Sequence, residues 1–345
     1  MNKQVLYNSL FPPKYPLHVR AIHRLAVEIR NIYEKTHPEC MAPPKRVTDH
    51  ELASEIMFNT LASNSPTMIA RFGGSELNAV TNYLGVLGGP KKAYAFVTAK
   101  QDQWWWGKTR IDHLTNNAGF FPREEWAVKK YSELMLEDMK YLDLLGSFTK
   151  FECYFKKELK DIPKIYLALL EPWFGSKPWT RILEGKKVLV VHPFAAQIED
   201  QYFNHREELF PGTQILPKFE LQTIQAVQSL GGKCDDFATW FDALEWMKSE
   251  IDKRDYDICI IGCGAYGFNL AAHVKRSGKK AVHLGGVTQM LFGIKGNRWE
   301  DPSYAFPEVN VPAGWYLNLI NDCWVKPDPS YRTKNADSVE GACYW

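Results

Sequence analysis

The second half of the chain alternates short apolar runs with longer amphipathic segments. The apolar runs, rich in β-branched residues, are 187–192 (KVLVVH), 257–261 (DICII) and 281–284 (AVHL). The segments with apolar side chains at the three- and four-residue spacing of a helix are 197–209, 237–251 and 266–276. Runs that are apolar throughout predict strands buried on both faces. Their alternation with helices predicts a Rossmann-like α/β fold, in which a mostly parallel sheet is flanked by helices.

The rest of the chain shows similar elements with weaker signals. Residues 67–72 (TMIARF) predict a buried strand that runs into a glycine turn and then into a helix near residues 77–84. The other expected elements are a helix opened by a capping box at Thr48 and Glu51, an irregular stretch over 91–109, a helix over 124–141, and short strands over 142–148, 164–170 and 214–219.

The N-terminal region reads as an extension of the main domain. Residues 20–33 carry apolar side chains near helical spacing, interspersed with arginines, and 34–47 contain three prolines typical of a linker. We therefore predict an N-terminal helical extension and linker over 1–47. The Rossmann-like domain, with a C-terminal tail, is expected over 48–345.

Composition narrows the class of protein. The 345 residues carry a net charge of only +2, which argues against nucleic acid as a partner. The seven cysteines show no CxxC spacing, and neither a signal-peptide core nor a stretch of membrane-spanning length is present, so we expect a cytoplasmic protein. A basic amphipathic helix such as 20–33 usually packs on its own domain; the alternative is peripheral association with the inner face of the membrane.

The strongest local motif is a glycine-rich turn between a strand and a helix. Residues 262–267 (GCGAYG) fit G-x-G-x-x-G, so the backbone of Gly262, Gly264, Ala265, Tyr266 and Gly267 is expected to hold a phosphate at the helix N-terminus. A dinucleotide would also need an acidic residue after the next strand, where this chain has 283–286 (HLGG). The motif therefore favours a nucleoside diphosphate over NAD. The alternative is that the glycines serve only helix–strand packing.

A second strand–glycine–helix turn lies at 71–76 (RFGGSE). Glu76 is placed there to act as a general base or a metal ligand, and Arg71 to offset phosphate charge, with Gly73, Gly74 and Ser75 as phosphate contacts. The alternative is that Glu76 only stabilises the N-terminus of its own helix.

Several other residues are weaker candidates for ligand binding. The polar connection 285–298 offers Gly285, Thr288, Gln289, Lys295 and Arg298 for phosphate or sugar. Trp105 and Trp106 are candidates for stacking an acceptor sugar, or equally for anchoring a core, and His192 and Glu220 follow expected strands. The chain contains no HExxH, G-x-S-x-G or GxxxxGK[ST] motif, which argues against a metalloprotease, an α/β-hydrolase and a P-loop NTPase.

The TMIARFGGSE segment resembles the GT-D-type glycosyltransferases, whose motif reads roughly R-[FY]-G-D-G-E; the match covers Arg71, Phe72, Gly73 and Glu76. The glycine loop, helix and strand over 262–286 resemble the same family. The GFFP segment at 119–122, blocks between 264 and 299, and the closing EGACYW resemble a group of proteins associated with bacterial surface-polysaccharide loci.

This resemblance implies a catalytic domain that transfers a sugar from a nucleotide-sugar donor to a glycan or lipid-linked acceptor. The family's D-x-E acids are associated with a divalent metal, Mn²⁺ or Mg²⁺, and with the donor diphosphate. Gly74 stands at the aspartate position here, so no metal ligand is assigned. Two other functions stay open: a nucleotide-sugar or NAD-dependent oxidoreductase, and a non-catalytic nucleotide-binding scaffold of the polysaccharide machinery.

Overall fold

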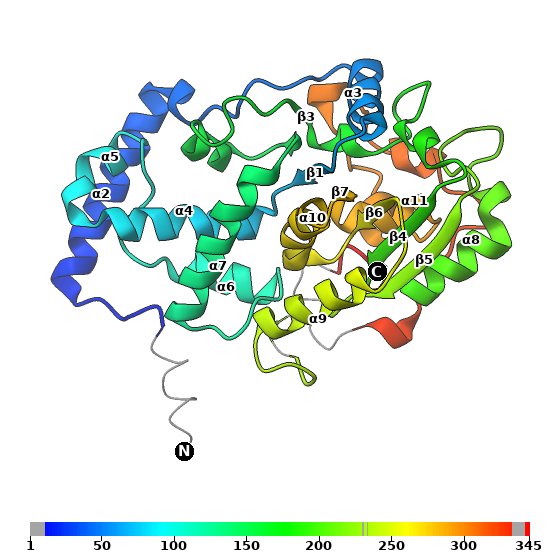
Figure 1. Ribbon diagram of the computed structural model, residues 1–345. Coiled ribbons are helices and arrows are strands. Elements are labelled where there is room, and N and C mark those ends of the chain that lie inside the picture. The colour runs from blue at the N-terminus through cyan, green and yellow to red at the C-terminus, as the bar shows by residue number, and fades with distance from the viewer. Residues whose placement is uncertain (1–10, 230, 233, 333–341) are drawn as a thin grey trace.

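The protein is an α/β protein built on one parallel sheet (Figure 1). The computed structural model describes residues 11–229, 231–232, 234–332 and 342–345. Its seven strands are β1 (Thr67–Arg71), β2 (Leu144–Ser147), β3 (Lys164–Tyr166), β4 (Lys187–His192), β5 (Glu220–Gln225), β6 (Ile258–Ile261) and β7 (Lys280–His283). All of the strand pairings are parallel, and the order is β3-β2-β1-β7-β6-β4-β5. This confirms the predicted Rossmann-like fold.

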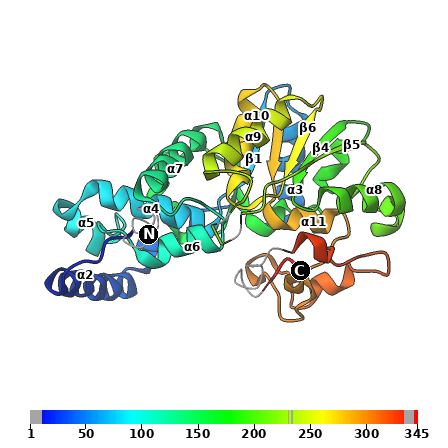
Figure 2. The same cartoon turned by 90° about the horizontal axis from the view of Figure 1, so that it is seen from below.

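Helices cover both faces of the sheet (Figures 1 and 2). One face carries α4 (Gly74–Gly88), α6 (Lys108–Asn116), α7 (Glu125–Asp138), α9 (Trp240–Asp252) and α10 (Gly267–Arg276). The other carries α3 (His50–Ala62), α8 (Ala195–Leu209) and the short α11 (Thr288–Leu291). In β4, Leu189 and Val191 join the first core while Val188 and Val190 join the second. Because both faces are covered, the strand is apolar throughout, which is why its pattern was readable.

Two further segments extend the main body. The N-terminal helix α2 (Leu17–Thr36) packs against the short helix α5 (Ala93–Val97), at the outer edge of the molecule (Figure 2). The C-terminal segment carries α12 (Asn297–Glu300) and several 3-10 turns, and it adds Tyr316 and Trp324 to the second core. Residues 1–10 of the predicted extension and 340–341 of the closing motif lie outside the described residues. None of the described helices combines the length and apolar composition that crossing a bilayer requires.

Two expected strands differ from the structure. The strand predicted over 214–219 is wrong: β5 begins at Glu220, because Tyr202 Oη both accepts from the Phe219 N–H and donates to the Phe219 carbonyl, at 2.7 and 2.8 Å. The backbone N–H and carbonyl of Phe219 therefore bond to Tyr202 and are not available for pairing with a neighbouring strand. Glu220 consequently starts a strand at the amino edge, away from the ligand edge where it was expected. The strand predicted over 164–170 stops at Tyr166 and continues as a 3-10 turn.

Two predictions about helices also differ from the structure. The capping residue of α3 is Asp49 rather than Thr48, since the Asp49 carboxylate accepts from the Leu52 N–H at 2.8 Å. The stretch over 91–109, predicted to be irregular, contains α5 and the start of α6.

Candidate functional site

A large cavity opens at the carboxyl ends of the strands. Its volume is about 710 Å³, within the range of roughly 300–1,000 Å³ usual for small-molecule sites. The residues that follow each strand in turn contribute to its lining: Gly73, Phe148, Leu167, Pro193, Val227, Gly262 and Gly285. This is the edge at which open parallel sheets bind their ligands.

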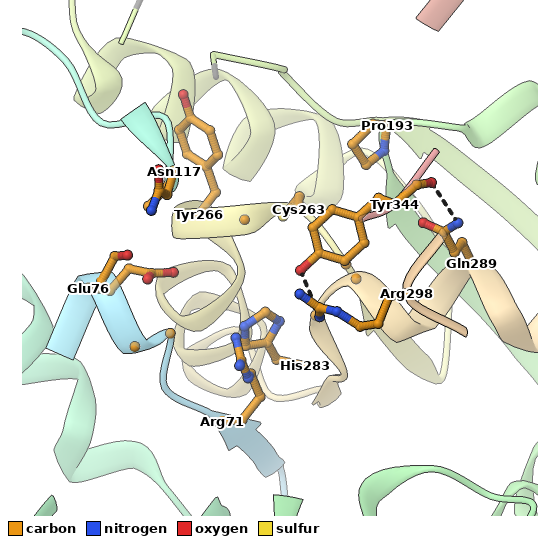
Figure 3. A pocket seen from close by; sticks show the side chains of 18 of the residues that line it. Arg71, Glu76, Asn117, Pro193, Cys263, Tyr266, His283, Gln289, Arg298 and Tyr344 are labelled. Atoms are coloured by element: carbon orange, nitrogen blue, oxygen red, sulfur yellow. Dashed lines mark hydrogen bonds between the residues drawn. The ribbon is translucent and has the colours of Figure 1, made fainter. Parts of the chain in front are cut away.

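The two predicted glycine turns meet in this cavity (Figure 3). Strand β7 pairs with both β1 and β6, so the turns that follow β1 and β6 lie about 10 Å apart across the sheet. The rings of Phe72 and Phe268, one beside each turn, stack with centroids 4.8 Å apart. The predicted residues that line the cavity are Arg71, Gly73, Gly74, Ser75, Glu76, His192, Gly262, Gly264, Tyr266, Gly285, Gln289 and Arg298.

Glu76 lies in the first turn of α4 and folds back over Gly73. A Cβ added at Gly73 would meet the Glu76 carboxyl atoms at 1.9–2.0 Å, so the absence of a side chain at Gly73 makes room for this carboxylate. Gly73 therefore makes room for Glu76, a role that the sequence analysis did not include, and its phosphate contact stays a prediction. Glu76 is the one side-chain carboxylate among the described residues that line the cavity. In Figure 3 it lies on the same side as Asn117.

Arg71 supplies positive charge to the cavity. Its guanidinium carbon lies 5.2 Å from the centroid of the Phe148 ring, its side chain is half-buried, and it forms no ion pair with any described residue. A second cation, Arg298, lies over the Tyr344 ring at 5.0 Å. An arginine such as Arg71, which forms no ion pair with a described residue, is suited to binding an anion.

Two of the three histidines that line the cavity, His192 and His283, are neutral. Burial lowers the pKa of His192 to about 3, and its Nδ1 accepts the Phe194 N–H at 3.0 Å. Burial, with a smaller contribution from Arg71, also lowers the pKa of His283 to about 3. Neither of these two imidazoles adds charge at neutral pH, and Arg71 and Arg298 are the permanently charged cations of the lining.

The glycines of the 262–267 turn have separate roles. Gly264 is exposed and has a φ of +55°, a left-handed conformation that favours glycine. A Cβ at Gly262 would lie 2.6 Å from the Gly285 carbonyl, and one at Gly267 would lie 2.1 Å from the His283 ring. Gly262 and Gly267 therefore permit close packing, as the alternative interpretation proposed, while Gly264 keeps the backbone open toward the cavity. The Tyr266 ring stacks on Trp240, and its hydroxyl pairs with Ser229 at 2.8 Å.

Four predicted phosphate contacts lie outside the cavity lining. Ala265 and Gly267 are buried behind the turn. The Thr288 hydroxyl is buried and donates to the Gly285 carbonyl at 2.8 Å. Lys295 lies 3.5 Å from Glu300 in an ion pair. Thr288 therefore holds the Gly285 backbone at the cavity without lining the cavity itself.

The predicted acceptor residues Trp105 and Trp106 are also outside the cavity lining. The Trp105 ring stacks on His23 of α2, with centroids 3.9 Å apart, and Trp106 is buried against Phe11. They lie outside this cavity because the residues between α5 and α6 turn toward α2. Trp105 anchors the N-terminal helix through His23, and Trp106 anchors the residues just before that helix, which fits the alternative role of core anchors.

Several lining residues were missed by the sequence analysis. His113 and Asn117 come from α6 and its end, and Tyr304, Phe306, Tyr344 and Trp345 come from the C-terminal segment. Gln289 Nε2 donates to the Tyr344 carbonyl at 3.1 Å, which fixes the closing residues against the cavity wall (Figure 3). The C-terminal segment is irregular, so hydrophobic periodicity carries no signal for its position.

The cavity offers a poor ligand set for a divalent metal. Glu76 supplies one carboxylate, and Gly74 leaves the second position of the D-x-E pattern without one. Among the described residues, the cluster with metal-ligand geometry is His205, Glu208 and Cys323, which lies outside the cavity. The positively charged side chains that the cavity lining offers to an anion are Arg71 and Arg298.

A buried acid near the cavity predicts a pH dependence of stability. Burial raises the pKa of Glu171 to about 8, although Tyr316 Oη donates to its carboxylate at 2.5 Å and Arg298 is nearby. A raised folded pKa means that the folded protein holds a proton that the unfolded chain loses above about pH 4.5, so stability falls as pH rises from 4.5 to 8. We expect wild type to lose roughly 3–5 kcal/mol between pH 5 and pH 9 relative to Glu171→Gln, measured by denaturant unfolding.

The comparison with Glu171→Gln cancels the opposite contribution of His192 and His283. Their lowered pKa values make the protein less stable as pH falls below 6.5, equally in both proteins. Parallel stability curves for wild type and variant would contradict a protonated Glu171.

Comparison with known proteins leaves the site to be interpreted from its geometry: no protein-family model, curated protein or solved structure matches the chain.

Proposed function

We propose that the protein is a glycosyltransferase that moves a sugar from a nucleotide-sugar donor to a glycan or lipid-linked acceptor in surface-polysaccharide assembly. The observation that carries the proposal is that Arg71, Glu76 and the Gly262–Gly264 turn, chosen from sequence as two separate motifs, line one cavity. A cavity with one carboxylate and two arginines suits a reaction that deprotonates one oxygen and releases a diphosphate.

The proposed chemistry assigns each group a role. The donor diphosphate lies between Arg71 and the Gly264 turn, where backbone N–H groups and the N-terminus of α10 favour an anion. Glu76 takes the proton of the acceptor hydroxyl, and the freed oxygen attacks the anomeric carbon. The bond from that carbon to the diphosphate breaks, and the leaving diphosphate carries away the electron pair. Arg71 and Arg298 stabilise its charge in place of a metal.

The aromatic side chains of the cavity favour a sugar as the bound group. Tyr304, Phe306, Tyr344 and Trp345 line it beside Arg298. Ring faces with polar edges suit the alternating apolar and hydroxyl surfaces of a sugar. These residues replace Trp105 and Trp106 as the proposed sugar contacts.

The NAD-dependent alternative has less support from the cavity. The lining residues at the carboxyl end of β7 are His283, Gly285 and Gly286, none of which is the acid that a dinucleotide ribose requires. The scaffold alternative keeps the nucleotide and lacks turnover, so binding alone does not separate it from an enzyme.

A thermal-shift panel tests the donor site. The ligands are UDP, GDP, CDP, CMP, ADP and NAD, each with and without Mn²⁺. One nucleoside diphosphate at a hundred times its dissociation constant is expected to stabilise the fold by about 2.7 kcal/mol, and to do so without metal. Stabilisation by NAD alone would favour the oxidoreductase. Stabilisation by none of the six would contradict a donor site.

The variant Gly74→Asp provides the matched metal control. A Cβ at Gly74 meets no atom within 4 Å, so the aspartate fits and restores the D-x-E pair. We expect Mn²⁺ to increase nucleotide stabilisation in this variant and not in wild type. A wild type that needs Mn²⁺ would contradict the assignment of charge stabilisation to arginines.

A further inference from the structure

An apolar stripe on α2 lies open to solvent. Of the twelve large apolar side chains exposed among the described residues, five belong to this one helix. They are Leu17, Ile22, Leu25, Ile29 and Ile32, with exposed fractions of 80, 57, 63, 46 and 64%. The last four follow the three- and four-residue spacing that puts them on one face of a helix. A contiguous exposed apolar stripe indicates an interaction surface.

A different face of α2, next to the stripe, holds the helix in place. His23, Ala26 and Arg30 are buried there. Arg30 donates to the carbonyls of Phe96 and Gln101 at 3.2 and 2.8 Å. The apolar stripe is therefore displayed by a helix that is already anchored, at the outer edge of the molecule (Figures 1 and 2).

The region around the stripe is strongly basic. Residues 14–36 and 74–101, which contain α2, α4 and α5, hold eight Lys and Arg against three Glu, a net charge of +5 in a chain whose total is +2. Arg20, Arg24 and Lys35 are exposed on α2 and form no ion pair with a described residue. Lys91 and Lys92, just before α5, are exposed as well.

This charge decides which partner fits the stripe. Pairing two copies of the chain through α2 would bring two regions of the same sign together, which is unfavourable. An anionic lipid surface offers the complementary charge, and its interface accepts the aliphatic side chains. The helix would lie in the plane of the membrane, because it does not qualify as a membrane span.

We propose that α2 docks the protein onto an anionic membrane surface, with Ile22, Leu25, Ile29 and Ile32 inserted at the headgroup boundary and Arg20, Arg24 and Lys35 contacting lipid phosphates. The proposal stands apart from the proposed catalysis, since none of these residues lines the cavity.

Vesicle flotation of the full chain tests this surface. The vesicles contain either pure phosphatidylcholine or phosphatidylcholine with 30% phosphatidylglycerol. Wild type is expected to float with the anionic vesicles, less so at 0.5 M NaCl. The fourfold variant Ile22→Ser, Leu25→Ser, Ile29→Ser, Ile32→Ser is expected to stay in solution. Arg20→Gln with Arg24→Gln should weaken binding by about thirtyfold, since each basic side chain near an anionic surface contributes about 1 kcal/mol.

A matched control changes exposed apolar residues elsewhere. Phe203 and Leu317 are 67 and 42% exposed outside α2, and Phe203→Ser with Leu317→Ser is expected to float like wild type. Unchanged melting temperatures would show that the α2 variants fold. The proposal would be overturned if wild type bound neither kind of vesicle, or if the α2 variants floated like wild type. Light scattering gives a further test. If wild type were a dimer and the fourfold variant a monomer, the stripe would bind a second copy of the chain, and the proposal would be overturned.

Discussion

Replacing Glu76 by glutamine is expected to lower turnover of the nucleotide-sugar donor by about 10²–10⁴-fold, the usual contribution of a general base. Glutamine keeps the size of the side chain that lies over Gly73 but accepts no proton. Nucleotide affinity should change little, because the proposed diphosphate contacts come from Arg71 and the Gly264 turn. The measurement is the rate of nucleotide release under saturating donor and acceptor.

The control for Glu76 is another first-turn glutamate. Glu125 occupies the first turn of α7 outside the cavity lining, so Glu125→Gln should keep full activity. Loss of a carboxylate at a helix N-terminus costs about 0.3–1 kcal/mol of stability, which both variants would share. If Glu76→Gln turned over donor as fast as wild type, Glu76 would only stabilise its helix.

Replacing Arg71 by methionine is expected to weaken nucleoside diphosphate binding by about 10–100-fold. A hydrogen bond to a charged group contributes about 1.5–3 kcal/mol, and 1.4 kcal/mol is tenfold in affinity. Methionine retains an apolar chain against Phe148 and removes the charge and the N–H donors of the guanidinium. Isothermal titration with the nucleotide selected by the thermal-shift panel measures the loss.

The control for Arg71 is a half-buried arginine elsewhere. Arg206 of α8 pairs with Glu207 outside the cavity lining, so Arg206→Met should bind nucleotide like wild type. Equal affinities of Arg71→Met and wild type would remove Arg71 from the diphosphate site.

The sequence was most informative where both faces of a strand are buried. Val188 to Val191 and Ile258 to Ile261 alternate between the two cores, so their apolar runs identified β4 and β6 directly. Each glycine turn was recognised from the strand before it and the helix after it. The pairing of β7 with both β1 and β6, which brings these turns together, depends on strand order and is not written in either motif.

The failures have physical causes at particular residues. We expected α2 to pack through its apolar side chains, yet it packs through His23, Ala26 and Arg30. Arg30 donates hydrogen bonds to two backbone carbonyls, and His23 stacks on the Trp105 ring. Tyr344 reaches the cavity through irregular chain that has no period to detect. Both cases depend on contacts between segments far apart in sequence.

The most direct test of the proposed donor site is a crystal structure with the nucleoside diphosphate that gives the largest thermal shift. We expect diphosphate oxygens within about 3 Å of the Arg71 guanidinium and of backbone N–H groups in the Gly264 turn, with Glu76 facing the position of the transferred sugar. A nucleotide bound elsewhere, or one whose diphosphate contacts neither Arg71 nor that turn, would contradict the proposal that the two turns form one donor site.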